Sequence, residues 1–135
     1  MTTVTITPDT VAALIAEAGY EVDHVDDLLV VKDLDTDLAV TVALEGEVAF
    51  LSLACTSIPS EQLTPVLMQR FLDAENGIST SFFQISRRDD GRVAISLNNY
   101  AKLQACGHDD FDDLEFCLEA LFTDVVAARA LFDDA

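Results

Sequence analysis

The spacing of the apolar runs in the first half of the chain constrains its fold more than any other feature. The polar segments that separate these runs, 33–37 and 45–47, are too short for the crossover that two parallel strands require. The sequence therefore predicts an antiparallel meander of three strands joined by short turns. The expected strands cover residues 27–31, 38–44 and 48–55.

Helices are expected on both sides of this meander. Thr7 can cap a helix and Pro8 is tolerated in the first turn, so a helix is predicted from Pro8 until Gly19, which favours a helix end. A second Thr-Pro pair at 64–65 predicts another helix, which ends at Gly77.

The segment RRDDGR, residues 87–92, holds three of the seven basic residues of the chain. Strand-like runs flank it at 81–86 and 93–97, and its Asp-Asp-Gly sequence is typical of a tight turn. We therefore expect a hairpin with a cationic tip, followed by a linker over residues 98–108.

The last predicted helix runs from about Asp109 to Phe132 and is apolar on two faces. Its main seam recurs at alternating spacings of three and four residues, and a second apolar row includes Phe116 and Leu131. Such a helix needs cover from the sheet and also from another helix or a partner subunit.

Together these elements predict the order α-β-β-β-α-β-β-α. Because the connections between strands are too short for parallel crossovers, we expect an α+β fold with helices packed on an antiparallel sheet. The 135 residues, half of them hydrophobic, match the size of one ordinary domain, to which we assign residues 1–135.

The charge of the chain limits its partners. Its 25 acidic and 7 basic residues give a formal net charge of -18, which repels phosphate backbones and anionic membranes. Nucleic-acid and membrane partners are therefore not expected, whereas a basic protein partner would be attracted. The alternative is that the composition, rich in Asp and poor in Lys, reflects a salt-adapted or GC-rich source.

The cysteines and the apolar stretches bear on location. Cys55, Cys106 and Cys117 occupy apolar contexts without CxxC spacing, which favours buried free thiols over disulfides or metal ligands. The apolar stretches are far shorter than the roughly 20 residues of a membrane span, and the N-terminus lacks a signal-peptide pattern. A cytoplasmic protein is expected.

No pattern of catalytic, cofactor-binding or metal-binding residues is found. Of the two histidines, His108 lies near Cys106 and Asp109, but a loop before a capped helix explains this arrangement better than a site does. A small-ligand or enzymatic pocket near His108 is kept as an alternative. The five glycines are isolated, so no phosphate-binding loop is predicted.

The acidic segment DLDTD resembles the opening of a calcium loop, because Asp33, Asp35 and Asp37 alternate along it. However, Leu38 stands where such a loop requires glycine, and Leu44 stands where it requires a bidentate acid. A polar hairpin turn is therefore the prediction, and no metal site is expected.

The run from LMQRFLDAENG through SFFQISRRDDGRVAISL to the acidic start of the last helix resembles the YbjN-type domain family, as do the element order and the acidity. The pattern is also similar to that of type III secretion chaperones. The resemblance covers nearly the whole chain and implies a small dimeric protein without enzymatic activity. YbjN-type proteins are regarded as bacterial sensory-transduction regulators, whereas the secretion chaperones bind an extended segment of a secreted substrate.

We therefore expect a non-enzymatic, homodimeric module that binds a protein or peptide partner, as a YbjN-type regulator or chaperone-like protein. A type III secretion chaperone is the alternative; the missing Leu-rich and Gly-rich stretch after the second helix favours the YbjN-type interpretation.

The candidate interface combines aromatic and cationic residues. Phe82 and Phe83 are neighbours on one strand, so only one can serve the core, and the other meets solvent, a second helix or a partner. The arginines of the hairpin tip either neutralise Asp89 and Asp90 locally or face the acidic first turn of a second subunit's last helix. The candidate residues are Phe82, Phe83, Arg87, Arg88, Arg92, Phe116 and Leu131.

Overall fold

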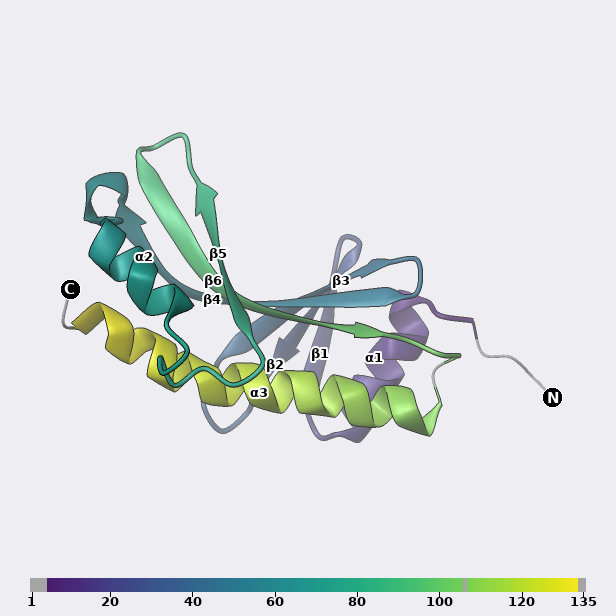
Figure 1. The fold of residues 1–135 in the computed structure, drawn as a ribbon. Coiled ribbons are helices and arrows are strands. Elements are labelled where there is room, and N and C mark those ends of the chain that lie inside the picture. Colours follow the sequence, from purple (N-terminus) through teal and green to yellow (C-terminus); the bar gives the residue numbers. More distant parts are fainter. Residues whose placement is uncertain (1–4, 106, 134–135) are drawn as a thin grey trace.

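A computed structural model describes residues 5–105 and 107–133 of the protein (Figure 1). In these residues the chain forms three α-helices, one short 3-10 helix and six strands. The helices are α1 (Pro8–Glu17), η1 (Ser60–Gln62), α2 (Pro65–Leu72) and α3 (His108–Asp133). The strands are β1 (Glu21–Val25), β2 (Leu28–Lys32), β3 (Ala39–Glu45), β4 (Val48–Pro59), β5 (Phe82–Arg87) and β6 (Arg92–Lys102).

All six strands join one antiparallel sheet in the order β1-β2-β3-β4-β6-β5, which confirms the predicted α+β class. Figure 1 shows α3 lying along one face of this sheet, with α1 beside its N-terminal half and α2 beside its C-terminal end. The helices of the described chain therefore cover one face. The other face is left open to solvent.

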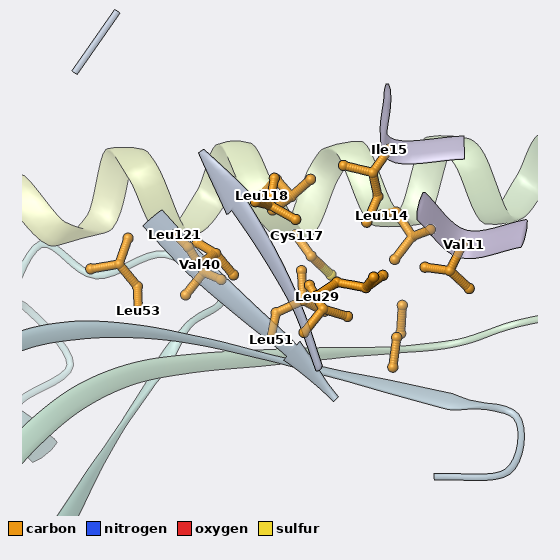
Figure 2. Packing of buried hydrophobic residues seen from close by; sticks show 14 of the residues in the cluster. Val11, Ile15, Leu29, Val40, Leu51, Leu53, Leu114, Cys117, Leu118 and Leu121 are labelled. Carbon is orange, nitrogen blue, oxygen red and sulfur yellow. The ribbon is translucent and has the colours of Figure 1, made fainter. Parts of the chain in front are cut away.

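The larger core lies between the sheet and the pair α1 and α3. It contains nineteen buried residues, and Figure 2 shows Leu29 and Leu51 from the sheet beneath Leu114 and Leu118 of α3. The seam predicted for the last helix is its buried side, as shown by the low exposure of its central members. These members, each at most 1% exposed, are Leu114, Leu118, Leu121, Val125 and Ala128.

A smaller core lies beneath α2. Its four buried residues are Leu67, Phe71, Val93 and Ile95. The strand β4 serves both cores, and a bulge at Cys55 shifts its register against β6 between Ala54 and Thr56. Because a bulge adds local twist and bend to a strand, the ends of β4, β5 and β6 near α2 curve away from β1, β2 and β3 (Figure 1).

The sequence-based prediction missed one strand and ended two others too early. The missing strand, β1, has the sequence EVDHV and lies at the edge of the sheet, so the order is α-β-β-β-β-α-β-β-α. The predicted linker over 98–108 is wrong in its first part, because Asn98 and Asn99 pair with β4 and β6 continues to Lys102. Likewise, β4 continues past its bulge to Pro59.

The predicted helix starts are confirmed. The Thr7 hydroxyl accepts the N–H of Thr10 at 3.2 Å, and the Thr10 hydroxyl accepts the N–H of Thr7 at 2.9 Å. Thr64 caps α2 by accepting the N–H of Leu67 at 3.2 Å. Gly19, with φ of +95°, follows the end of α1 as expected.

The end of α2 differs from the prediction, because the helix stops at Leu72 rather than at Gly77. Asp73 has an extended backbone, and the Asn76 side chain donates to the carbonyl of Phe71 at 2.8 Å. Polar side chains that bind nearby backbone groups in this way compete with the helical hydrogen bonds and end the helix early.

Candidate interaction surface

The open face of the sheet carries a patch of exposed aromatic side chains. Phe50 on β4 is 43% exposed, and its cross-strand neighbour Tyr100 on β6 is 59% exposed. Their ring centroids lie 6.4 Å apart. Phe82 on β5 is 41% exposed, and its pairing with Asn98 places it on the same face. Exposed aromatic side chains gathered on one face are typical of a contact surface.

A hollow of about 300 Å³ lies in this open face. Asn98 belongs to its lining and is only 7% exposed, although no helix covers this side of the sheet. The Asn98 amide donates to the Ser96 hydroxyl at 3.0 Å. Apolar walls give a bound group contact area, and a desolvated amide beside them fixes its orientation. The lining residues are Thr41, Ala43, Phe50, Leu51, Ser52, Phe82, Gln84, Asn98 and Asn99.

The two adjacent phenylalanines of β5 have different surroundings, as their strand positions predicted. Phe83 is half-buried and stacks on Phe71 of α2, with ring centroids 4.4 Å apart. It therefore belongs to the smaller core of the same chain. Phe82 lies on the opposite side of the strand and remains available to a partner.

The RRDDGR segment forms the turn between β5 and β6, as predicted. Gly91 has φ of +81°, and the Arg88 N–H donates to the Arg92 carbonyl at 2.9 Å. Arg92 is held by β4, because its guanidinium donates to the Ser57 carbonyl at 2.6 Å. The side chains of Arg87 and Arg88 are exposed, and within the described residues they form no ion pair with the aspartates of the turn.

The two candidate interface residues on α3 are placed differently from each other. Phe116 is 57% exposed on the outer side of the helix. Leu131 is half-buried against the smaller core, and its carbonyl accepts a hydrogen bond from Arg70 at 3.0 Å. Phe82 and Arg87 lie at opposite ends of β5, and their partners Asn98 and Val93 place them on opposite faces of the sheet, so the structure does not bring the candidate residues together. Phe116 lies apart from both, on the outer side of α3.

A second group of exposed apolar side chains lies on the outer side of α2. Val66 is 59% exposed, Met68 is 37% exposed and Leu72 is 87% exposed. The buried side of this short helix, by contrast, consists of Leu67 and Phe71. The group is smaller than the open face and has no hollow with a buried polar group of its own among the described residues.

Two buried aspartates organise the segments around the site, and sequence reasoning did not single them out. Asp124 on α3 is 2% exposed and accepts hydrogen bonds from the backbone and the hydroxyl of Ser79 and from the backbone of Ser81. It therefore ties the segment before β5 to α3. Asp110 is 1% exposed and accepts the N–H of Gln104, which fixes the connection from β6 to α3.

The region around His108 has fewer features of a catalytic or ligand-binding site than the open face of the sheet has. His108 is exposed at the start of α3 and borders an open hollow of about 530 Å³. The polar side chains of this hollow, those of Glu17, His108 and Asp112, are all exposed, so none is desolvated as a catalytic or ligand-binding group would be. Cys106 lies outside the described residues.

In the acidic turn over residues 33–37, the side chains of Asp33 and Asp37 have partners within the turn or next to it. Asp33 accepts the N–H of Asp35 at 3.3 Å and the hydroxyl of Thr36 at 2.8 Å, and Asp37 forms an ion pair with Lys32 at 3.2 Å. The segment is the turn between β2 and β3, in agreement with the prediction. In the described ranges, no three His, Cys, Asp or Glu side chains are grouped to hold a metal.

The two described cysteines are free thiols in apolar surroundings. Cys117 is buried and donates to the Tyr100 carbonyl at 3.5 Å. Burial, with a smaller contribution from the negative charge of Asp113, raises the pKa of the Cys117 thiol to about 11. Burial also raises the pKa of Cys55. Because the thiolate is the reactive form, neither thiol has the character of a nucleophile.

Comparison with known proteins shows the fold of the chain but assigns no function to it. No family model matches the sequence, and no curated protein matches it. Among solved structures, the chain is similar to the crystal structure of YbjN, a candidate transcription regulator from E. coli. The TM-score is 0.68 at 13% sequence identity, and the match covers 96% of this chain and 93% of that chain.

The chain has a YbjN-type fold. The likeness confirms the expected arrangement of helices on an antiparallel sheet. At 13% identity, a YbjN-type fold carries no functional residue over from one chain to the other. Within the described residues, no helix is both long enough and apolar enough to cross a membrane.

Proposed function

We propose that this chain is a non-enzymatic interaction module whose open sheet face binds an extended segment of a partner protein. The observation that carries the proposal is the hollow in this face, with Phe50 and Phe82 in its walls and the buried amide of Asn98 beside them. An extended segment fits a sheet face because its alternate side chains point to the same side, so one can enter the hollow while its neighbours contact the surrounding strands.

The charge of the chain defines the chemistry of that segment. Glu21, Asp23 and Glu45 lie on the open face by their strand positions, and the whole chain has a formal net charge of -18. Lys32 and Lys102 lie on the same face, and Lys32 is already paired with Asp37. The segment is therefore expected to place an apolar or aromatic side chain in the hollow and to carry Lys or Arg beside it.

This mode of binding serves a regulator and a secretion chaperone equally, because both require a surface that recognises a segment of another protein. The YbjN-type fold favours the regulator, with a type III secretion chaperone as the alternative. The two roles differ in the state of the bound protein. A chaperone holds its substrate unfolded outside the bound segment, whereas a regulator binds a folded protein through an exposed tail or loop.

A display library of random 12-residue peptides tests the proposal and requires no identified partner. The protein should enrich peptides that combine an aromatic or large apolar residue with Lys or Arg. Substituting Phe50→Ser should weaken the enriched peptides by at least about tenfold, since central aromatic side chains dominate such interfaces. Phe116→Ser is the matched control, because it removes an exposed aromatic side chain from the opposite side of the molecule.

If no peptide is enriched, or if the enriched peptides bind the Phe50→Ser and Phe116→Ser variants equally well, the open face is not the binding site. Loss of binding in the Phe116→Ser variant alone would move the site to α3.

A further inference from the structure

The hollow in the open face of the sheet exists because small residues lie between large ones. One transverse row of this face consists of Thr41 on β3, Ser52 on β4, Asn98 on β6 and Phe82 on β5, which pair in turn across the sheet. Thr41 and Ser52 have short side chains, whereas Phe82, and Phe50 in the neighbouring row, have large ones. The hollow therefore has aromatic walls above a floor of polar side chains.

The size and charge of the hollow limit what can enter it. Among the residues that the structure describes, no charged side chain lines the hollow, although the chain has 25 acidic and 7 basic residues. Its volume of about 300 Å³ is at the lower limit of pockets for small molecules, which span about 300–1,000 Å³. The hollow therefore has room for one large, uncharged side chain, and the basic residues of a bound segment belong outside it.

The orientation of the Asn98 amide leaves its oxygen without a partner. The amide nitrogen donates to the Ser96 hydroxyl at 3.0 Å and to the Ser96 carbonyl at 3.4 Å. Because a carbonyl oxygen only accepts hydrogen bonds, the nitrogen and not the oxygen of the amide must face Ser96. The oxygen accepts no hydrogen bond from the described residues, and Asn98 is 7% exposed in the lining of the hollow. It is therefore a desolvated acceptor beside whatever enters the hollow.

We propose that the side chain bound in this hollow is an aromatic ring with a hydrogen-bond donor, tyrosine or tryptophan, and that the Asn98 oxygen accepts its hydrogen bond. This inference rests on the proposed function, because it specifies one residue of the bound segment. Phe50 and Phe82 supply contact area to the ring, while its O–H or N–H reaches the amide. A phenylalanine or leucine would fill the hollow but would displace water from the Asn98 oxygen without replacing the hydrogen bond.

Two small molecules test the inference without a peptide. p-Cresol corresponds to the side chain of tyrosine, and toluene, which corresponds to that of phenylalanine, differs from it only in lacking the hydroxyl group. p-Cresol should bind at least about tenfold more tightly than toluene, as measured from the NMR shifts of backbone amides around the hollow. Apolar contact alone predicts the opposite order, since toluene is the more hydrophobic of the two compounds.

Two variants test the assignment to Asn98. Asn98→Leu should abolish the difference between p-cresol and toluene, because leucine has a similar size but no acceptor. Gln84→Leu is the matched control, since it removes an exposed amide from the lining of the same hollow and should preserve the difference. Circular dichroism shows whether Asn98→Leu is folded. The comparison of the two compounds on the unsubstituted protein is decisive even if this variant does not fold.

The peptides enriched by display give a second test. In a peptide whose binding depends on Phe50, replacing its tyrosine or tryptophan by phenylalanine should weaken binding to the unsubstituted protein by at least about tenfold. The same replacement should have little effect on binding to Asn98→Leu, because that variant has no acceptor to leave unsatisfied. Isothermal titration calorimetry measures the four affinities of this cycle.

Three results would overturn the inference. One is toluene binding as tightly as p-cresol, and another is the absence of any shift around the hollow with either compound. The third is a preference for p-cresol that survives Asn98→Leu or is lost in Gln84→Leu. The two proposals fail separately. Enriched peptides that depend on Phe50 but are anchored by leucine would support the proposed function and contradict the inference, whereas selective binding of p-cresol without any enriched peptide would do the reverse.

Discussion

Asp124 is the residue whose loss should most clearly loosen the segment before β5 from the helix α3. Its carboxylate is 2% exposed and accepts the Ser79 N–H at 3.0 Å, the Ser79 hydroxyl at 2.9 and 3.0 Å, and the Ser81 N–H at 3.4 Å. Hydrogen bonds to a charged group contribute about 1.5–3 kcal/mol each, and donors left without a partner in a buried place add to the loss.

Because Ser79 is exposed and water can replace part of the lost bonding, Asp124→Ala should lower the free energy of unfolding by about 3 kcal/mol, less than the sum of these bonds but large for one substitution. Asp124→Asn should cost less, about 1–2 kcal/mol, because the amide keeps one acceptor oxygen for Ser79 and loses the second. The assay is urea unfolding followed by circular dichroism, with the midpoint and slope fitted together.

Glu119→Ala is the control for the Asp124 variants. It removes an exposed carboxylate from the same helix and should change the free energy of unfolding by less than about 0.5 kcal/mol. If Asp124→Ala and Glu119→Ala unfold at the same urea concentration, the hydrogen bonds to Ser79 and Ser81 do not stabilise the attachment of the segment before β5 to α3, and the stabilising role assigned to Asp124 is refuted.

Two further predictions concern close packing and burial. Gly77→Ala should destabilise the protein by about 1 kcal/mol more than Gly91→Ala in urea unfolding, because both glycines have positive φ but only at Gly77 would a new Cβ lie 3.1 Å from that of Ala127. Equal losses of stability in the two variants would contradict the close contact predicted at Gly77. Cys117 should make the free energy of unfolding fall between pH 9 and about 11, since its thiol ionises in the unfolded chain before it ionises in the folded one. The fall should be shallower in Cys117→Ala, and identical pH profiles would count against burial of the thiol.

The layout of the fold was predictable where local signals and tertiary structure agree. The Thr-Pro caps, the cationic hairpin and the seam of α3 each depend on residues close in sequence, and the structure has all of them. β1 was missed because Glu21 and Asp23 interrupt its apolar pattern. A signal for it existed in the two-residue turn of Asp26 and Asp27, where Asp26 has φ of +55°, but aspartate marks such a turn less clearly than glycine does.

The candidate surface was predictable only in part. The alternation of side chains along a strand correctly separated Phe82 from Phe83. The hollow was not foreseen, because it requires β3, β4, β6 and β5 side by side in one register, and Asn98 was assigned to a linker. Asp124 was also missed, since an acidic residue in a chain with 25 acids gives no sign of its burial.

The bulge at Cys55 divides the protein into two regions of unequal resistance to opening. On one side, nineteen buried residues hold α1 and the body of the sheet to α3. On the other, four buried residues hold α2 against the far ends of β4 and β6. Because few side chains oppose its release, the smaller region should detach and reclose many times before the chain unfolds as a whole. Backbone amides of α2 would then exchange their hydrogens with water through this local opening, while those of β2 and β3 stay protected.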